Sequence, residues 1–425
     1  MSVNPFLAVR TAAAGLPALV RLAGGSRLVA AAMLDAVGTG LILPLTVLLF
    51  VVHERVPAHL VGLGISIGGV IALLLAPLGG HLVDRIGSKH ALIGAWLLGC
   101  AAVACYVLVR SWLEIIGVIT ALSFAGNISS TARSTLLASI VESSQLSRVM
   151  AIARSFRNAG YGVGGLLATA ALVAGSSGFL LAVYGDATSF LLAALLVSGM
   201  TSRPTPPRAV DIVRDDVTLR TVLTDWRYIA VTGFDALISF HQVALQVALP
   251  LWVVLYTHAP RALVGLLFTL NTVVVVIAQV RVSRDVRGLA QAPRTYVRGG
   301  LSMVAASAAF LSAHYVGARA AVVLLVIGAL FMTCAEMLCS AADWVVSFGL
   351  ADDDHRGKYL AVYSMGNSLG DAVGPSVSTA LLSAGAVVVW PAIAAIVAVG
   401  SLASAAVAHS ASRDRRVSGA DPALS

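Results

Sequence analysis

The chain alternates long apolar stretches with short polar segments. Each apolar stretch has about 20 residues or more, the length that a helix needs to cross the hydrocarbon core of a bilayer. Because lipid offers the peptide groups no hydrogen-bond partner, each stretch is expected to be helical. Twelve such helices are predicted, approximately at Leu28–Val52, Leu60–Leu82, Ala91–Val109, Leu113–Leu136, Met150–Ala174, Phe179–Met200, Tyr228–Tyr256, Leu263–Val282, Val297–Val316, Ala320–Phe348, Tyr359–Ala384 and Val387–Val407.

Composition and charge agree with a membrane protein. Of the 425 residues 58% are hydrophobic and only 11% are charged, whereas soluble domains average about 25% charged residues. The net charge is +8, and most Lys and Arg fall in segments that lie on one side if the N-terminus is cytoplasmic. This positive-inside bias predicts cytoplasmic termini and an inner-membrane location. Acidic lipid headgroups, rather than nucleic acid, are the expected partners of these basic residues.

The longest polar interruption divides the chain into two halves. It contains the sequence RPTPPR and several charged residues, a composition typical of a linker. The predicted organisation is a cytoplasmic N-terminal segment at 1–27, a six-helix half at 28–200, a cytoplasmic linker at 201–227, a second six-helix half at 228–409 and a cytoplasmic tail at 410–425.

A weak internal repeat supports this division. A shift of 210 residues aligns the segment 130–165 with the segment 340–375 without a gap. Gly160 then meets Gly370, Gly164 meets Gly374, and Arg133 meets Asp343. Together with six helices on each side of a linker, the repeat indicates a duplicated transporter architecture.

The short turn between the second and third predicted helices carries a dense charged motif. It reads GGHLVDRIGSKHAL, and its distinctive residues are Gly80, Leu82, Asp84, Arg85, Gly87, Lys89 and Leu92. Here the sequence resembles the major facilitator superfamily, whose signature in this turn is Gly-x-Leu-x-Asp-Arg-x-Gly-x-Lys-x-x-Leu. In the loop at 281–294, where the second copy should lie, only Asp285 and Gly288 keep the spacing.

The resemblance implies an all-α membrane protein with twelve transmembrane helices in two pseudo-symmetric six-helix halves. It also implies a secondary transporter that works by alternating access. In the turn, glycines permit close approach and a sharp bend. Asp84 can hold the positive end of a helix that docks against it. The turn, comprising Gly80, Asp84, Arg85, Gly87 and Lys89, is therefore predicted to act as a conformational latch. Arg85 and Lys89 are equally explained by the positive-inside rule.

Other patterns resemble bacterial drug and metabolite efflux members, including macrolide-exporter-like proteins. The fifth predicted helix is rich in glycine like that of the antiporters but lacks their Gly-Pro, which stands instead on the eleventh. The usual arginine of drug antiporters is missing from the fourth helix, where Ile119 stands. Glycine every four residues also favours plain helix packing. The residues concerned are Gly160, Gly164, Gly370, Gly374 and Pro375.

Acidic residues within apolar stretches are the main candidates for function, since a charge at the bilayer centre costs roughly 2.5–3.5 kcal/mol on insertion scales. Asp35 and Asp235 occupy matched depths on the first helix of each half, and Glu336 lies near mid-membrane. These three are candidates for proton coupling or substrate binding, or for pairing with a helix end or an arginine. Asp186 is expected to cap or pack. Arg133 and Asp343, placed at cytoplasmic helix ends, are candidates for an inner gate.

Uncharged polar residues on the same helices are candidates for lining a central cavity. They are Asn127, His241, Gln242, Gln246, Asn271, Tyr363 and Asn367. An otherwise apolar cavity with a few carboxylates suits amphipathic compounds, cationic ones included, and suits sugars poorly. His241 is equally explained as a packing residue.

No nucleotide-binding motif or metal-ligand cluster is found in the sequence, and no nucleophile–base pair emerges, so an enzyme is not expected. No cofactor is predicted, and the proton gradient is the expected energy source. The sequence thus predicts a monomeric, proton-coupled exporter of a small amphipathic compound, such as a drug or secondary metabolite. A proton-coupled importer of a nutrient or metabolite and a non-transporting membrane receptor are the alternatives.

Overall fold

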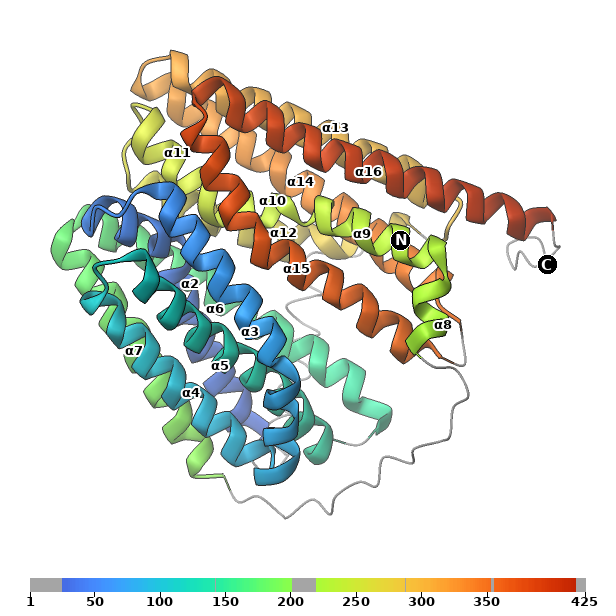
Figure 1. Cartoon of the computed structure of the whole chain (residues 1–425), viewed down its shortest axis with the longest axis horizontal. Coiled ribbons are helices and arrows are strands. Elements are labelled where there is room, and N and C mark those ends of the chain that lie inside the picture. Colours follow the sequence, from blue (N-terminus) through green and yellow to red (C-terminus); the bar gives the residue numbers. More distant parts are fainter. Residues whose placement is uncertain (1–24, 142, 201–218, 287, 353–354, 418–425) are drawn as a thin grey trace. The chain divides into compact units, whose positions relative to one another are not determined.

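The computed structural model describes residues 25–141, 143–200, 219–286, 288–352 and 355–417 (Figure 1). Within these ranges the chain is helical and forms no strand. Most of the predicted N-terminal segment, the first part of the linker at 201–218 and the end of the tail lie outside the described residues.

The first half of the chain forms six long helices, two of which end in a short turn of different pitch. They are α2 (Gly25–Leu48) with η1 (Leu49–His53), α3 (Ala58–Ile86), α4 (Ser88–Ala104) with η2 (Cys105–Leu108), α5 (Trp112–Ile140), α6 (Ser143–Val173) and α7 (Ser176–Ser198).

The second half begins with a short helix and continues with six long helical segments, the first of which is interrupted. They are α8 (Leu219–Thr224), then α9 (Trp226–Ile238), α10 (Phe240–Val243), η3 (Ala244–Ala248) and α11 (Leu249–Tyr256) in succession, α12 (Leu263–Asp285), α13 (Ala292–Ser312) with η4 (Ala313–Tyr315), α14 (Ala318–Leu350), α15 (Arg356–Ser383) and α16 (Ala386–Val417).

Nine of these segments are long and apolar enough to cross a membrane. The more polar α6, α13 and α15 are also long, at 31, 21 and 28 residues. Together they give twelve long helical segments in the described part of the chain, as the apolar pattern predicts. Helix ends differ, because a helix satisfies its own backbone and can continue past the apolar zone. Thus α6 begins at Ser143 rather than Met150, and α16 ends at Val417 rather than Val407.

The chain divides into two compact units. Unit 1 comprises Met1–Val210 with Arg261–Ile277, and unit 2 comprises Asp211–Pro260 with Ala278–Ser425. Helices α2–α7 therefore belong to unit 1 together with the first part of α12, although the sequence places that helix in the second half of the chain.

Each unit has its own helix packing. In unit 1, α2 packs against α6 and α7, while α5 packs against α3 and α4. In unit 2, α13 packs against α14 and α16, and α9 packs against α15 and α16. Large aromatic side chains fill one end of unit 2. The indole of Trp252 donates a hydrogen bond to the carbonyl of Phe310 at 2.9 Å, and the rings of Phe310 and Trp390 lie 4.3 Å apart.

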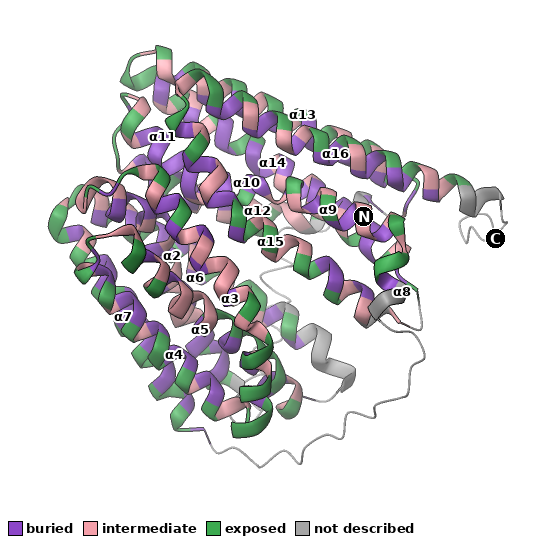
Figure 2. Cartoon of the chain, in the orientation of Figure 1, coloured by how far each residue is buried: buried purple, intermediate pink, exposed green. Residues whose placement is uncertain are grey.

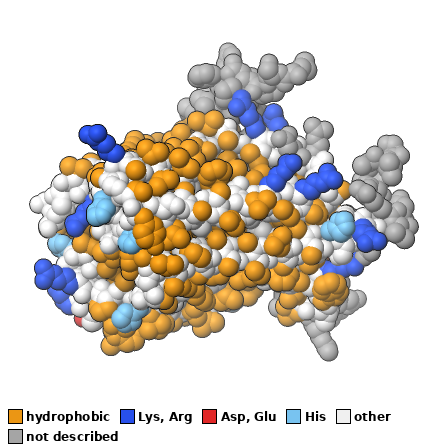
Figure 3. All heavy atoms as spheres, turned by 90° about the horizontal axis from the view of Figure 1, so that it is seen from above, with side chains coloured by type: hydrophobic (Ala, Val, Ile, Leu, Met, Phe, Trp, Pro, Cys, Tyr) orange, Lys and Arg blue, Asp and Glu red, His pale blue; other side chains and the backbone are white. Residues whose placement is uncertain are grey.

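Many of the exposed residues on these helices are large hydrophobic ones, unlike the surface of a soluble protein, and Figure 2 shows where the exposed residues lie. Val173, Leu74 and Leu181 are 75%, 73% and 67% exposed. On the face shown in Figure 3, hydrophobic side chains cover the middle, and Lys, Arg and His lie toward the two ends. Lipid tails would cover such a surface, because they are as apolar as leucine.

Glycines on α6 and α15 lie against other helices of their own units. A side chain at Gly160 would meet the carbonyl oxygen of Met33 on α2, and one at Gly164 would meet the backbone around Gly40. In unit 2, Gly370 faces the backbone of Ala236 on α9 and Gly374 faces Val243 on α10. Pro375 lies inside α15 directly after Gly374.

The turn between α3 and α4 is as short as the sequence suggests. Gly87 alone joins the two helices, and its φ of 83° is one that side chains rarely tolerate. The Lys89 ammonium donates a hydrogen bond to the carbonyl of Met200. Within unit 1 the close approach does not occur at Gly80, because no atom of that unit lies within 4 Å of a Cβ there. Its neighbour Gly79 faces inward instead, against Ile128 of α5.

We predict that Gly164→Ala weakens the contact between α6 and α2. The added methyl group would lie 2.6 Å from the backbone of Gly40, which cannot move aside as a flexible side chain could. Overpacking of this kind costs about 1–3 kcal/mol, so the melting temperature of the purified protein should fall by several degrees. Gly126→Ala on α5 is the control, since nothing lies within 4 Å of that position. Equal melting temperatures for the two variants would contradict the prediction.

Candidate functional site

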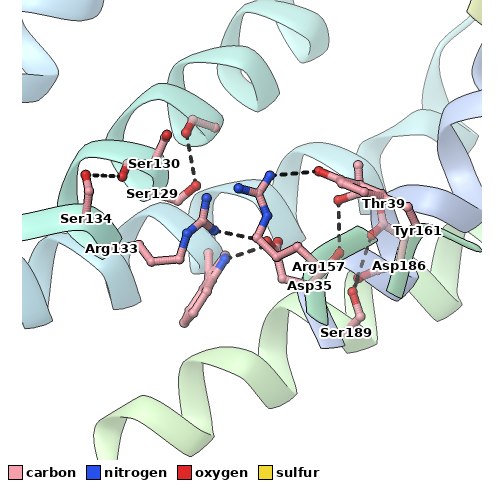
Figure 4. Close-up of polar contacts among 12 residues, drawn as sticks. Asp35, Thr39, Ser129, Ser130, Arg133, Ser134, Arg157, Tyr161, Asp186 and Ser189 are labelled. Atoms are coloured by element: carbon pink, nitrogen blue, oxygen red, sulfur yellow. Dashed lines mark hydrogen bonds and ion pairs between the residues drawn. The ribbon is translucent and has the colours of Figure 1, made fainter. Parts of the chain in front are cut away.

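Asp35 lies at the centre of a polar cluster in unit 1 (Figure 4). Its Oδ2 is 3.6 Å from Nη1 of Arg133 on α5. Its Oδ1 accepts a hydrogen bond of 3.1 Å from the indole nitrogen of Trp96 on α4. The side chains of Arg133 and Asp35 are only 12% and 13% exposed. One carboxylate on α2 therefore connects three helices of unit 1.

The burial of this pair makes it energetically consequential. Removing two charges from water is costly, and their attraction offsets that cost only where hydrogen bonds satisfy the remaining atoms. Trp96 supplies such a bond to Asp35. The sequence predicts Arg133 at the end of its helix, where a gate residue would lie. In the structure α5 continues seven residues past Arg133, to Ile140. A role of Arg133 in an inner gate stays a prediction.

A second buried carboxylate, Asp186 on α7, lies close to Asp35. It is 1% exposed, feels the charge of Asp35, and its carboxyl group abuts Gly38 on α2. The hydroxyl of Ser189 donates a hydrogen bond of 3.3 Å to Oδ1 of Asp186. Of the two roles expected for Asp186, packing agrees with its burial, whereas capping does not, because α7 begins ten residues earlier at Ser176. The acidic residue in an apolar stretch was the only sequence signal for this position.

A cavity of about 460 Å³ opens beside the Asp35–Arg133 pair, between α5 and α6. Arg133, Arg154 and Arg157 all line it. Arg157 donates a hydrogen bond of 3.0 Å to the hydroxyl of Tyr161, and its guanidinium lies over the Tyr161 ring at 5.8 Å. Sequence reasoning missed Arg154 and Arg157 because they were attributed to the positive-inside bias.

Unit 2 contains a different polar cluster, formed by α9, α13, α14 and α15. The carboxyl groups of Asp235 and Asp343 face each other, with Tyr363 and Asn367 beside them. The hydroxyl of Tyr296 donates a hydrogen bond of 2.6 Å to Asp343. Asp235 is 2% exposed, and its Oδ2 has no hydrogen-bond partner in the described part of the chain.

Two carboxylates that face each other in a buried site cannot both be ionised at reasonable cost. The Asp235–Asp343 pair is therefore a candidate site for holding a proton. Asp343 lies seven residues before the end of α14 at Leu350, as Arg133 lies seven before the end of α5. Equivalent positions of the repeat thus face the acid of the first helix in each unit, with an arginine in unit 1 and a second acid in unit 2.

Most of the remaining candidates have local partners. Asn127 donates a hydrogen bond of 3.3 Å to the carbonyl of Ala72, which joins α5 to α3. Nδ1 of His241 lies 2.7 Å from the carbonyl of Ile238, and Nε2 is buried without a partner among the described residues. The hydroxyl of Ser239 donates to the amide oxygen of Asn367.

The other predicted residues lie apart from these clusters or in another unit. Gln242 is exposed, whereas Gln246 and Glu336 are half-buried. Asn271 is buried, on the part of α12 that belongs to unit 1. The structure therefore assembles Asp35 with Arg133, and Asp235 with Asp343, Tyr363 and Asn367.

A family comparison identifies the architecture. The model of the Major Facilitator Superfamily matches residues 28–348. The chain belongs to the Major Facilitator Superfamily. No curated protein matches it in sequence.

Solved structures of this superfamily's fold resemble the chain along most of its length. The nucleoside transporter NupG is 13% identical, with a TM-score of 0.74 and with 90% of this chain and 98% of that chain covered. A D-xylose-proton symporter is 13% identical, with a TM-score of 0.70 and coverage of 88% and 96%. A bacterial homologue of the iron transporter ferroportin is 18% identical, with a TM-score of 0.65 and coverage of 92% and 98%.

Membership of the Major Facilitator Superfamily confirms the predicted fold class and the multi-pass membrane location. It also makes the chain a transporter rather than an enzyme, acting on a small-molecule substrate in the membrane. At these identities the structural likeness shows the fold alone.

We predict that Asp35 and Arg133 are strongly coupled in stability. Arg133→Met should cost about 3–5 kcal/mol, because it leaves a buried carboxylate without its cation. Asp35→Asn in the same molecule should restore much of that loss. A double-mutant cycle on the melting temperature measures the coupling. The comparison pair is Glu54 with Arg110, whose side chains are 10% and 64% exposed, and its coupling should be smaller because the guanidinium is largely in water. Additive effects at Asp35 and Arg133 would contradict the prediction.

Proposed function

We propose that this member of the Major Facilitator Superfamily exports a small amphipathic compound, such as a drug or secondary metabolite, in exchange for protons. The buried pair of Asp35 and Arg133 carries this proposal. Within a membrane-spanning helix an ionisable residue is a functional candidate by default, and this one has an ionic partner and an indole donor.

A proton on Asp35 would act as the switch. The ionised carboxylate attracts Arg133, whereas the protonated acid does not, so proton binding frees the arginine and loosens the link between α2 and α5. One charge that crosses 100 mV supplies about 2.3 kcal/mol, which is comparable with typical coupling free energies of about 1–3 kcal/mol. The proton gradient can therefore drive the cycle, and the proposal needs no nucleotide cofactor.

Asp235 and Asp343 form a second proton site in this proposal. The pair differs from Asp35 and Arg133 in having no cation, so its proton is exchanged between two acids and the Tyr296 hydroxyl. Two unlike proton sites would let the two units respond to protons differently. Support for this role comes from the burial of Asp235 and from the place of Asp343, which matches that of Arg133 in the repeat.

The mechanism we infer is alternating access by two six-helix halves, at 28–200 and 228–409. The turn of Gly80, Asp84, Arg85, Gly87 and Lys89 would serve as its latch. Asp84 is exposed and makes no ion pair within the described residues, so its carboxylate is available to a helix N-terminus. We further propose a monomer in the cell inner membrane with both termini cytoplasmic, in keeping with the bias of Lys and Arg along the chain.

A second candidate function is import together with protons. The observation that favours it is the arginine-lined cavity beside Asp35. A proton on Asp35 leaves this cavity more positive, and an anionic nutrient or metabolite would then enter along with the proton. Export in exchange for protons requires instead that the substrate and the proton compete.

We predict that Asp35→Asn abolishes substrate-dependent proton movement. The assay uses purified protein in proteoliposomes with an imposed pH gradient and a pH-sensitive dye in the lumen. Lipophilic cations, antibiotics, organic anions and sugars are added in turn. A lipophilic compound should dissipate the gradient with the parent protein but not with Asp35→Asn, because the amide cannot carry the proton.

Glu54→Gln is the control, since Glu54 pairs with the exposed Arg110 at a helix end and lies outside the cluster. Unchanged proton movement in Asp35→Asn would remove Asp35 from the coupling mechanism. Proton entry that requires the compound on the same side, rather than on the opposite side, would establish the importer and overturn export.

A further inference from the structure

The cavity between α5 and α6 carries more positive charge than its own residues neutralise. We propose that it binds an oxyanion group, such as a carboxylate, phosphate or sulfonate, with Arg154 and Arg157 as the ligands. The inference rests on the proposed function only in treating the bound compound as the transported one, and an anion in this cavity would favour the second candidate, import together with protons, over export. Binding itself follows from the cavity.

The charge balance is the first argument. Three arginines line the cavity, and one carboxylate, Asp35, lies beside them, in an ion pair with Arg133 and within electrostatic reach of Arg157. Arg154 makes no ion pair or hydrogen bond within the described part of the chain. Arg157 bonds only the neutral hydroxyl of Tyr161, and its Nε is buried without an acceptor in that part of the chain. A buried donor that lacks an acceptor destabilises the structure, and an oxyanion would satisfy it.

Helical spacing is the second argument, because it directs these groups to one place. Residues three and four apart share a helix face. Arg154, Arg157 and Asn158 therefore point from α6 into the cavity, while Ser130, Arg133 and Ser134 point into it from α5. Figure 4 shows the Arg133 and Arg157 side chains converging on the same region, and their charges repel each other. Such repulsion is relieved by an anion between them.

The chemistry of the donors is the third argument. A guanidinium presents a planar fork of N–H groups that matches the two oxygens of a carboxylate or phosphate. Asn158 and the serines add uncharged donors, and Leu137 and Met150 supply apolar wall. The volume of about 460 Å³ lies within the roughly 300–1,000 Å³ of small-molecule sites. The cavity therefore fits an amphipathic anion, not the cationic compound that the acidic residues alone suggested.

An anionic lipid headgroup offers the same oxyanion chemistry, and the experiment separates it from a soluble compound. Full-length protein is placed in nanodiscs of neutral phosphatidylcholine. Calorimetry then measures the binding of 2-naphthoate and 2-naphthyl phosphate, with naphthalen-2-ylmethylamine as the cation of matched shape. A parallel arm measures the melting temperature in nanodiscs that contain phosphatidylglycerol.

We expect the naphthyl anions to bind and the amine not to bind. Arg154→Gln and Arg157→Gln should each weaken anion binding by on the order of tenfold or more, since each removes a charge-assisted hydrogen bond. Arg157→Lys should recover part of the loss, because it keeps the charge without the fork. Arg281→Gln, at an exposed position on α12 outside the cavity, is the matched control and should bind like the parent protein.

Equal anion binding by the parent protein, Arg154→Gln and Arg157→Gln would overturn the proposal, as would equal binding of the amine. Arginine-dependent stabilisation by phosphatidylglycerol without binding of the soluble anions would assign the cavity to lipid and overturn it as well. Anion binding that depends on the arginines, without proton movement by any compound, would support this site while refuting the proposed function. Proton movement by cations without anion binding would refute this site alone.

Discussion

A charge inside the hydrocarbon core of a bilayer needs a partner or a proton, and this constraint organises both units. Unit 1 gives Asp35 an arginine and an indole donor. In unit 2, Asp235 faces a second acid, Asp343, which accepts a hydrogen bond from the hydroxyl of Tyr296. In unit 1 the contact joins α2 to α5, and in unit 2 it joins α9 to α14, which occupies the place of α5 in the repeat. The duplicated fold has therefore kept one juxtaposition and changed its chemistry, from an acid that faces an arginine to an acid that faces a second acid.

The helices were predictable because hydropathy and helix formation have the same cause in lipid. Apolar stretches of sufficient length must be helical there, so all twelve long segments could be located from the sequence. Their ends were less predictable, as Ser143 and Val417 show, since a helix can extend into the aqueous zone without an apolar signal. The turn at Gly87 was predictable from glycine chemistry, whereas the open surroundings of Gly80 depend on how α3 packs.

The candidate site was predictable only for single residues. Asp35 and Asp235 were evident as acids in apolar stretches, but nothing local in the sequence joins Asp35 to Arg133, which stands on another helix. Arg157 shows the same limit. In the sequence, its charge is equally explained by the positive-inside rule. Only its place in the wall of the cavity makes it a candidate ligand. Contacts between helices depend on side-chain packing, for which hydropathy carries no information.

In the proposed mechanism, Arg133 connects the charge of the substrate to the direction of proton flow. It contacts Asp35 and also lines the cavity, so a proton on Asp35 and a ligand in the cavity act on one guanidinium. Coupling between two binding sites is reciprocal. Protonation of Asp35 releases positive charge into the cavity, which strengthens the binding of an anion and weakens that of a cation. An anion and a proton therefore favour each other and travel together, whereas a cation and a proton compete and are exchanged. Through Arg133, the sign of the substrate's charge would therefore decide between import and export.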